Sequence, residues 1–235
     1  MSTFEIKIIA LITMILDHIG FVFRFSTLRY AGRIAFPIYA FLIGEGCLHT
    51  KNIKRYLLRL LFFAFISEIP FDLMRSAAMG RQIQTAADLI DLSAQNVFFT
   101  LFLGAFCLAV YLHVKKITGD IAALFIGLIT MIACAYAAEL LRSDYGSIGV
   151  IIISAPIIVS DLVKREDIKR QVRILTTALC LCYLYRFAGD FLIAALISLI
   201  FILIYNGRAG RPIKWVFYLI YPVHMIILSL IWLYL

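Results

Sequence analysis

Long apolar runs separated by short polar stretches dominate the pattern along this chain. With about 20 apolar residues needed to cross a bilayer, the pattern predicts an all-α polytopic transmembrane helical bundle of about nine spans. The loops are short and marked by Gly, Pro, Asn or charge, except for 75–95, which has room for a short interfacial helix. One domain over 1–235 is expected. The predicted spans are 4–24, 30–48, 55–74, 96–114, 119–141, 146–162, 171–186, 188–205 and 214–234.

The composition supports a membrane protein. Hydrophobic residues make up 63% of the chain and charged residues only 15%, whereas soluble domains have about 25% charged residues. Mean hydropathy is +0.98. The first apolar run is not followed by a small-residue cleavage site and a soluble body, so we interpret it as a retained span and not as a removed signal peptide.

The distribution of basic residues predicts an orientation, because cytoplasmic loops carry an excess of Lys and Arg. The net charge of +8 arises from small clusters between spans, so topology explains it and nucleic acid is not an expected partner. With the N-terminus inside, the C-terminus lies outside. The inner segments then hold 15 of the 22 basic residues, including every lysine: Lys7, Lys51, Lys54, Arg55, Arg59, Lys115, Lys116, Lys164, Arg165, Lys169, Arg170, Arg173, Arg208, Arg211 and Lys214.

The cysteines and histidines do not predict a metal site. The five cysteines lie inside apolar runs, as ordinary reduced membrane cysteines do. The four histidines lack ligand spacing such as HExxH, so no metal is expected.

The stretch "MILDHIGFVFR" places Asp17 and His18 inside the first predicted span. A charge at the centre of a membrane helix costs roughly 2.5–3.5 kcal/mol, so such residues usually face the protein interior or a wet cavity. His18 lies roughly 21 Å along the span at 1.5 Å per residue, in its outer half. Other polar groups are expected near that depth, namely Arg33, Glu68, Asn96 and Tyr145. Glu45 lies close to an inner helix end, and His224 near mid-membrane.

Each of these residues has a structural and a functional interpretation. Asp17 can pair with Arg24, Arg29 or Arg33 and fix packing, and adjacent residues on a helix do not face each other. An Asp17–His18 catalytic dyad is therefore disfavoured. His18 is either a buried histidine bonded to a carbonyl or a proton acceptor near neutral pH, for which histidine is the best-suited side chain.

A basic cluster, "HTKNIKRYLLR", begins the third predicted span. Its members Lys51, Lys54, Arg55 and Arg59 either set topology or also hold a polyphosphate.

Several blocks of the chain resemble the TraX family of integral membrane proteins, which is linked to N-terminal acetylation of F-type pilin. The blocks are "LITMILDHIGFVF", "LRYAGRIAFPIYAFLIGEGCLHTKNIKRYLLRLLFFAFISEIPFDL", "NVFFTLFLG", "SDYGSIGV" and "FYLIYPVHMIIL". The resemblance covers most of 5–110 and the last span. It implies a single acyltransferase-like domain in a bacterial cytoplasmic membrane, with acetyl-CoA as co-substrate.

The resemblance also implies site residues. His18 is the expected base or acyl carrier, with Asp17, Arg33 and Glu68 as further catalytic candidates. Arg33 or Asn96 would stabilise an oxyanion. Glu45 and His224 are further motif positions. The positions of other polar residues, not the resemblance, complete the set of candidate substrate-binding residues: Glu45, Lys51, Lys54, Arg55, Arg59, Asn96, Tyr145 and His224. The acceptor would be a pilin-type peptide N-terminus or an envelope glycan. No oligomeric state is predicted.

Two other classes of function stay open at this point. A small transporter or flippase would use the same buried charges as a relay. A non-catalytic scaffold of an export or pilus assembly would use the polar blocks for packing and leave His18 without a chemical role.

Overall fold

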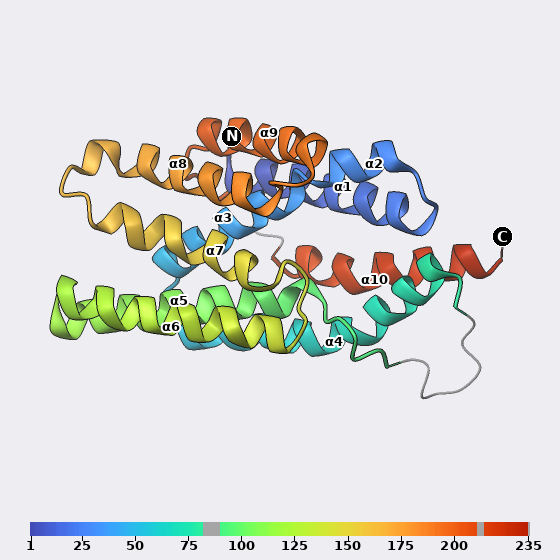
Figure 1. Ribbon diagram of the computed structural model, residues 1–235, viewed down its shortest axis with the longest axis horizontal. Coiled ribbons are helices and arrows are strands. Elements are labelled where there is room, and N and C mark those ends of the chain that lie inside the picture. Colours follow the sequence, from blue (N-terminus) through green and yellow to red (C-terminus); the bar gives the residue numbers. More distant parts are fainter. Residues whose placement is uncertain (82–89, 211–213, 235) are drawn as a thin grey trace. The chain divides into compact units, whose positions relative to one another are not determined.

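The computed structural model describes residues 1–81, 90–210 and 214–234, and helices dominate these ranges (Figure 1). No β-strand is present in the described residues, apart from an isolated bridge between Gln95 and Ser143. The helices are α1 (Thr3–Val22), α2 (Ser26–Gly32), α3 (Ala35–His49), α4 (Ile53–Met79), α5 (Val97–Thr118), α6 (Asp120–Leu140), α7 (Gly146–Asp161), α8 (Glu166–Leu184), α9 (Gly189–Ile204) and α10 (Lys214–Leu233).

The all-α prediction is confirmed, and each predicted span contains a helix. The second span differs because it is divided into α2 and α3, with a turn at Arg33 and Ile34. Pro37 explains the division, since its ring lacks an N–H and clashes with the carbonyl four residues earlier, that of Arg33. Proline is tolerated in the first turn of a helix, so α3 begins just before it.

The number of spans is approximate. Among the described residues, four stretches are long and apolar enough to cross a membrane, namely 26–49, α5, α6 and 215–234, and α7 and α9 are shorter apolar helices. Helix α1 has 20 residues but carries Glu5, Lys7 and Asp17. Helix α4 continues to Met79, beyond the predicted end of its span. Of the expected interfacial helix in 75–95, residues 82–89 lie outside the described residues, and 90–95 are not helical.

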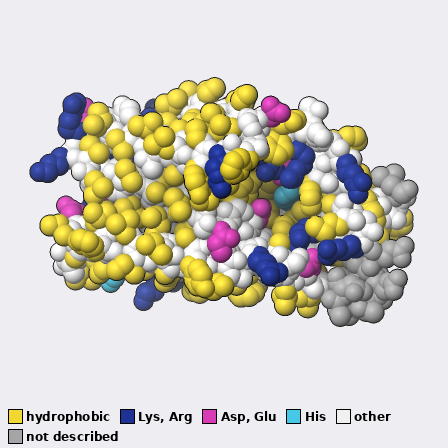
Figure 2. All heavy atoms as spheres, viewed as in Figure 1, with side chains coloured by type: hydrophobic (Ala, Val, Ile, Leu, Met, Phe, Trp, Pro, Cys, Tyr) yellow, Lys and Arg dark blue, Asp and Glu magenta, His cyan; other side chains and the backbone are white. Residues whose placement is uncertain are grey.

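Apolar side chains cover the outer surface of several helices, as a bilayer requires. On α6, Phe125, Ile129, Ile132 and Tyr136 are each 64–67% exposed and follow a spacing of three or four residues, which places them on one helix face. Figure 2 shows hydrophobic side chains over much of the visible surface, with Lys and Arg side chains in separate small groups. The chain is therefore a multi-pass membrane protein.

The helices form two compact units. Unit 1 comprises 1–39, 65–93 and 187–235, and unit 2 comprises 40–64 and 94–186. Helices α3 and α4 each contribute residues to both units.

Unit 1 is built on α1, which contacts α2 and α10, while α2 contacts α9. A capping box between Ser2 and Glu5 begins α1 and satisfies backbone N–H groups of its first turn. The rings of Phe4 and Phe217 meet edge to face at 6.1 Å between centroids, and Tyr30 packs on Phe191 at 5.0 Å. Aromatic contacts thus join α1 to α10 and α2 to α9.

Unit 2 is a bundle in which α5 contacts α6 and α7, and α7 also contacts α6 and α8 (Figure 1). Helices α5 and α7 approach closely at Gly104, where an added Cβ would lie 2.7 Å from Cβ of Ile153. Asn96 begins α5, because its side-chain oxygen accepts from the N–H of Phe98 at 3.0 Å. Its amide nitrogen donates to the carbonyl of Ala64 on α4 at 2.8 Å.

Candidate functional site

The central feature of unit 1 is a pair of histidines from opposite ends of the sequence. His18 on α1 lies with its Nδ1 2.5 Å from Nε2 of His224 on α10. The two imidazole rings are parallel to within 2°, with centroids 4.8 Å apart. His224 is buried, at 7% exposure, and His18 is half-buried. Sequence reasoning named both residues but did not predict their contact.

His224 is itself held by its own helix. Its Nδ1 lies 2.7 Å from the carbonyl oxygen of Ile220, one turn earlier on α10. The ring of Tyr221 borders both histidines, with centroids 6.0 Å from His18 and 5.8 Å from His224. The pair is therefore fixed by a backbone acceptor on one side and an aromatic ring on another.

Asp17 points to a different neighbour. Its Oδ2 accepts from Nη1 of Arg29 at 2.9 Å, and its Oδ1 accepts from Nη2 of Arg33. The Nε of Arg33 also donates to the carbonyl of Arg29 at 3.2 Å. Asp17 and Arg33 are only 9% and 8% exposed, so this is a largely buried ion triad. The expected pairing of Asp17 with nearby arginines is confirmed for two of the three candidates.

Close backbone packing between α1 and α2 makes the triad possible. A Cβ added to Gly32 would lie 2.2 Å from Cβ of Asp17, and one added to Gly20 would lie 2.7 Å from the carbonyl oxygen of Phe25. Only glycine permits such an approach. As expected for adjacent helix positions, Asp17 faces α2 and His18 faces α10, so the two do not form a dyad.

Glu68 and the end of α4 also belong to unit 1. Glu68 is half-buried, and one turn later the carboxylate of Asp72, at 1% exposure, accepts from the N–H of Asp91 at 2.9 Å. Arg75 and Arg81 both pair with Asp91. Hydrogen bonds from Ser93, and then these two arginines, lower the pKa of Asp91 below its usual value. This network fastens Asp91 to the end of α4.

The remaining predicted site residues lie in unit 2, where Glu45 and Asn96 have structural partners. Glu45 pairs with Arg173 at 3.3 Å and with His49 at 3.5 Å. Asn96 caps α5 and binds α4, as described above. Tyr145 precedes α7 in the left-handed region, at φ 64°. These contacts give Glu45 and Asn96 a packing role, and their binding roles stay predictions.

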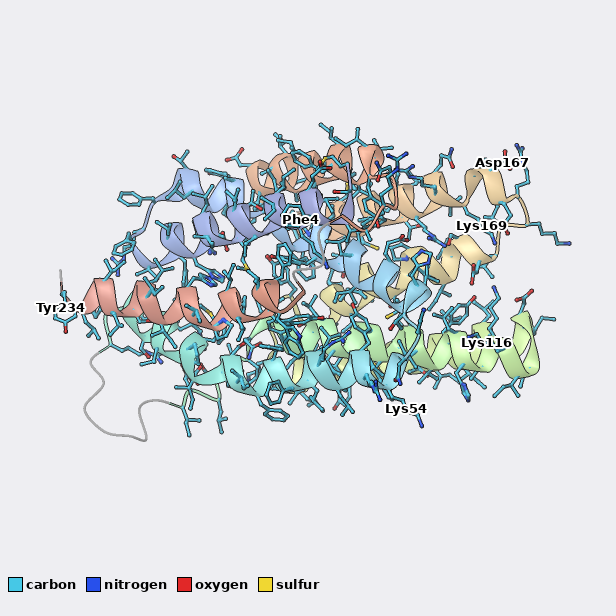
Figure 3. The ribbon with its side chains drawn as sticks, turned by 180° about the vertical axis from the view of Figure 1, so that it is seen from behind. Phe4, Lys54, Lys116, Asp167, Lys169 and Tyr234 are labelled. Atoms are coloured by element: carbon cyan, nitrogen blue, oxygen red, sulfur yellow. The ribbon has the colours of Figure 1, made fainter. Side chains whose placement is uncertain are left out.

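The basic cluster at the start of α4 differs from those basic residues of unit 2 that pair with carboxylates. Lys51, Lys54 and Arg55 are exposed and Arg59 is half-buried. Within the part of the chain that the structure describes, none of the four has a carboxylate within 4.0 Å. In contrast, Asp161 pairs with Lys115 at 2.8 Å and with Lys169 at 3.9 Å. Figure 3 shows Lys54, Lys116, Asp167 and Lys169 toward the same end of unit 2.

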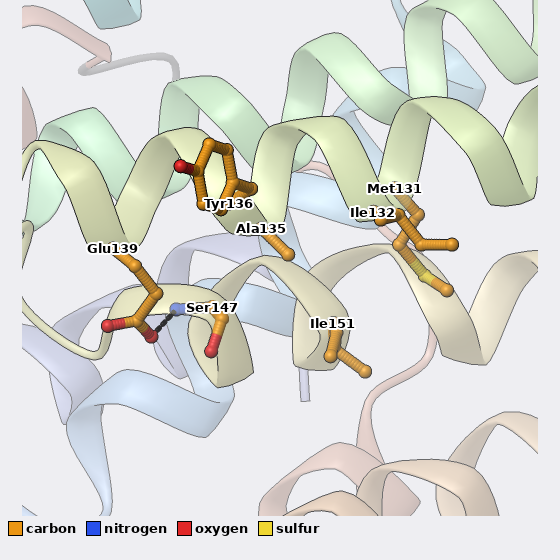
Figure 4. A pocket seen from close by; sticks show the side chains of 7 residues that line it. All are labelled: Met131, Ile132, Ala135, Tyr136, Glu139, Ser147 and Ile151. Atoms are coloured by element: carbon orange, nitrogen blue, oxygen red, sulfur yellow. Dashed lines mark hydrogen bonds between the residues drawn. The ribbon is translucent and has the colours of Figure 1, made fainter.

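A pocket of about 280 Å³ opens between α6 and α7 (Figure 4). It is lined mostly by apolar side chains, and the carboxylate of Glu139 at one end accepts from the N–H of Ser147 at 2.8 Å. None of the predicted site residues lines this pocket, which is bordered by Met131, Ile132, Ala135, Tyr136, Glu139, Ser147 and Ile151.

The two units thus divide the predicted site residues by role. The catalytic candidates Asp17, His18, Arg33 and Glu68 all belong to unit 1, as does His224. The other binding candidates belong to unit 2: Glu45, Lys51, Lys54, Arg55, Arg59, Asn96 and Tyr145. Arg29 was missing from the predicted site, although its position four residues before Arg33 places both on one helix face.

The fold and the site together define a multi-pass helical membrane protein with a histidine pair and an ion triad inside one unit. The family profile described as TraX protein matches residues 2–232. The chain therefore belongs to the TraX family. It is 28% identical over 254 residues to a probable fimbrial assembly protein FimC, serogroup H1, from Dichelobacter nodosus, with 97% of this chain and 94% of the relative covered. No solved structure matches the chain.

The ion triad generates a stability prediction. Asp17→Asn leaves two arginines facing a neutral amide in a largely buried site, which should lower the free energy of unfolding by about 3–5 kcal/mol. Thermal unfolding in detergent micelles would measure the change. Asp167→Asn, which breaks an exposed pair with Arg165, is the matched control and should have little effect. Equal stability of the two variants would contradict a stabilising role for the triad.

Proposed function

We propose that this chain is an integral membrane acetyltransferase that moves an acetyl group from cytoplasmic acetyl-CoA to an amine or hydroxyl of an acceptor. The His18–His224 pair is the observation that carries the proposal, because a half-buried imidazole held by a second imidazole suits proton transfer. Membership of the TraX family and the likeness to a probable fimbrial assembly protein support a role in the cell envelope. The acceptor is then a pilin-type peptide N-terminus or an envelope glycan.

In this proposal His18 accepts the acceptor's proton as the acceptor attacks the thioester carbonyl. A carbon–nitrogen or carbon–oxygen bond forms, the carbon–sulfur bond breaks, and the proton leaves with the CoA thiol. A general base in this position contributes roughly 10²–10⁴-fold to the rate. A covalent acetyl group on His18 would serve the same overall reaction.

The basic cluster at the start of α4 is the proposed site for the CoA phosphates. Its four side chains lack carboxylate partners among the described residues, so their charge is available to an anionic ligand. Several cations near α7 and α8 already have a carboxylate partner: Lys115 pairs with Asp161, Arg165 with Asp167, and Arg173 with Glu45. Topology alone would require positive charge in both places, but it would not require four cations so close in sequence all to lack carboxylate partners.

We predict an N-terminus in the cytoplasm and a C-terminus on the opposite side of a bacterial cytoplasmic membrane, because all lysines then lie inside. An export-dependent enzyme reporter fused after Leu235 should be active, whereas the same reporter fused after Lys116 should be inactive. Activity of both fusions, or only of the second, would reject this orientation and the cytoplasmic source of acetyl-CoA.

His18→Ala should abolish acetyl transfer, with a loss of at least about 10²-fold, while expression and acetyl-CoA binding stay near normal. The assay is transfer of labelled acetyl from acetyl-CoA by protein purified into liposomes. His113→Ala, which removes an exposed histidine from α5, is the control and should retain activity. If His18→Ala transfers acetyl at the wild-type rate, a transporter or scaffold becomes the better explanation of the buried polar residues.

Reversing the charge of Lys54 and Arg55 together to glutamate should weaken acetyl-CoA binding, and the loss should be largest at low salt, where screening is weakest. Binding of labelled acetyl-CoA at several salt concentrations measures this effect. The matched control reverses Lys116 and Lys164, which are also exposed, and changes the net charge equally. Equal losses in the two double variants would mean that the start of α4 contributes only to topology.

A further inference from the structure

The contacts of His224 determine which of its nitrogens carries a proton. Its Nδ1 lies 2.7 Å from the carbonyl oxygen of Ile220, and a carbonyl can only accept a hydrogen bond. Nδ1 of His224 is therefore protonated. In a neutral His224 ring, Nε2 is then the unprotonated nitrogen and acts as an acceptor.

The contact with His224 in turn determines which nitrogen of His18 carries a proton. Its Nδ1 lies 2.5 Å from Nε2 of His224, and a nitrogen–nitrogen hydrogen bond needs one donor and one acceptor. Nδ1 of His18 must be the donor. A neutral His18 then carries its lone pair on Nε2, the ring nitrogen that is not used in the contact with His224.

We propose that His224 is a positioning residue that holds His18 in the Nδ1–H tautomer and so makes Nε2 of His18 the base. The proposal rests on the proposed acetyltransferase function and adds the identity of the reactive nitrogen. The charged groups nearest on α1 and α2 are Asp17, Arg29 and Arg33, which bind one another. Tyr221 contributes a ring contact to both histidines. His224 is thus the group that fixes the tautomer.

This arrangement also gives the transferred proton a second location. When Nε2 of His18 takes the acceptor's proton, the proton on Nδ1 of His18 can move to Nε2 of His224. His224 then carries the positive charge, bonded to the carbonyl of Ile220, and His18 is neutral again. Return of that proton through His18 to the CoA sulfur completes the transfer with no net gain or loss of protons.

Nitrogen-15 spectra of ring-labelled histidine in the purified protein test the tautomer without any substrate. We expect His18, assigned by its absence from His18→Ala, to have a protonated Nδ1 and an unprotonated Nε2. In His224→Leu that preference should be lost. In His224→Gln it should be kept, because the glutamine oxygen can accept from Nδ1 of His18. A wild-type His18 protonated on Nε2 would overturn the proposal.

Kinetics provide the second readout. His224→Leu should lower kcat by about 10²-fold with the KM for acetyl-CoA unchanged, since the loss lies in proton transfer. The kcat of His224→Gln should lie between those of His224→Leu and the wild type, because glutamine keeps the tautomer of His18 but cannot take a proton. His113→Leu is the control and should match wild type. Wild-type kcat in His224→Leu would also overturn the proposal.

The two proposals fail in different ways. If wild-type protein transfers no acetyl group, the acetyltransferase assignment fails, while the spectra still decide whether His224 sets the tautomer of His18. If the wild type is active but its spectra show Nε2 protonated, only the role of His224 is rejected. If His224→Leu fails to fold, the wild-type and His224→Gln spectra still show which ring nitrogen of His18 is protonated, and a proton on Nε2 would reject the role of His224.

Discussion

The burial of the Asp17 carboxylate between two arginines is the interaction on which the site in unit 1 depends. A single charge in an apolar setting is costly, and breaking a buried pair usually costs more than the pair contributes. Here one carboxylate meets Arg29 and Arg33 through separate oxygens, so both of its oxygens are satisfied. The contact holds α2 against α1 at Gly32, where no side chain could be accommodated. With Asp17 committed to α2, the next residue, His18, is directed to α10.

The histidine pair follows from that placement. A half-buried histidine next to two arginines would be a poor base if its ring could turn freely, because its tautomer and direction would both vary. His224 removes that freedom, since it is anchored by its own helix at Ile220. The chemistry proposed for His18 therefore uses parts from α1 and α2, which are consecutive in sequence, and from α10, which is separated from them by most of the chain.

Much of the fold was predictable from the sequence because apolar runs of span length have few alternatives to helices. The departures have local physical causes, such as the division of the second span by Pro37. The sequence indicated most of the residues of the site, but not which of them lie in contact. Asp17 lies close in sequence to its arginines, so helical periodicity could suggest the pairing. His18 and His224 are separated by 206 positions, and no periodicity connects α1 to α10. Likewise, the sequence shows which residues are basic, but not which of the cations near α7 and α8 have carboxylate partners.

The adjacency of Asp17 and His18 limits how α1 can move. Successive residues on a helix are rotated by about 100° about its axis, and here each of two successive side chains is bonded to a different helix. Rotation of α1 about its axis, or a shift along it by one residue, would break both contacts together. Any rearrangement that admits a substrate beside His18 must therefore either carry α1 and α2 as one rigid body or displace α10. In both cases the contact between α1 and α2 stays intact, and the contact between α1 and α10 is the one that can open.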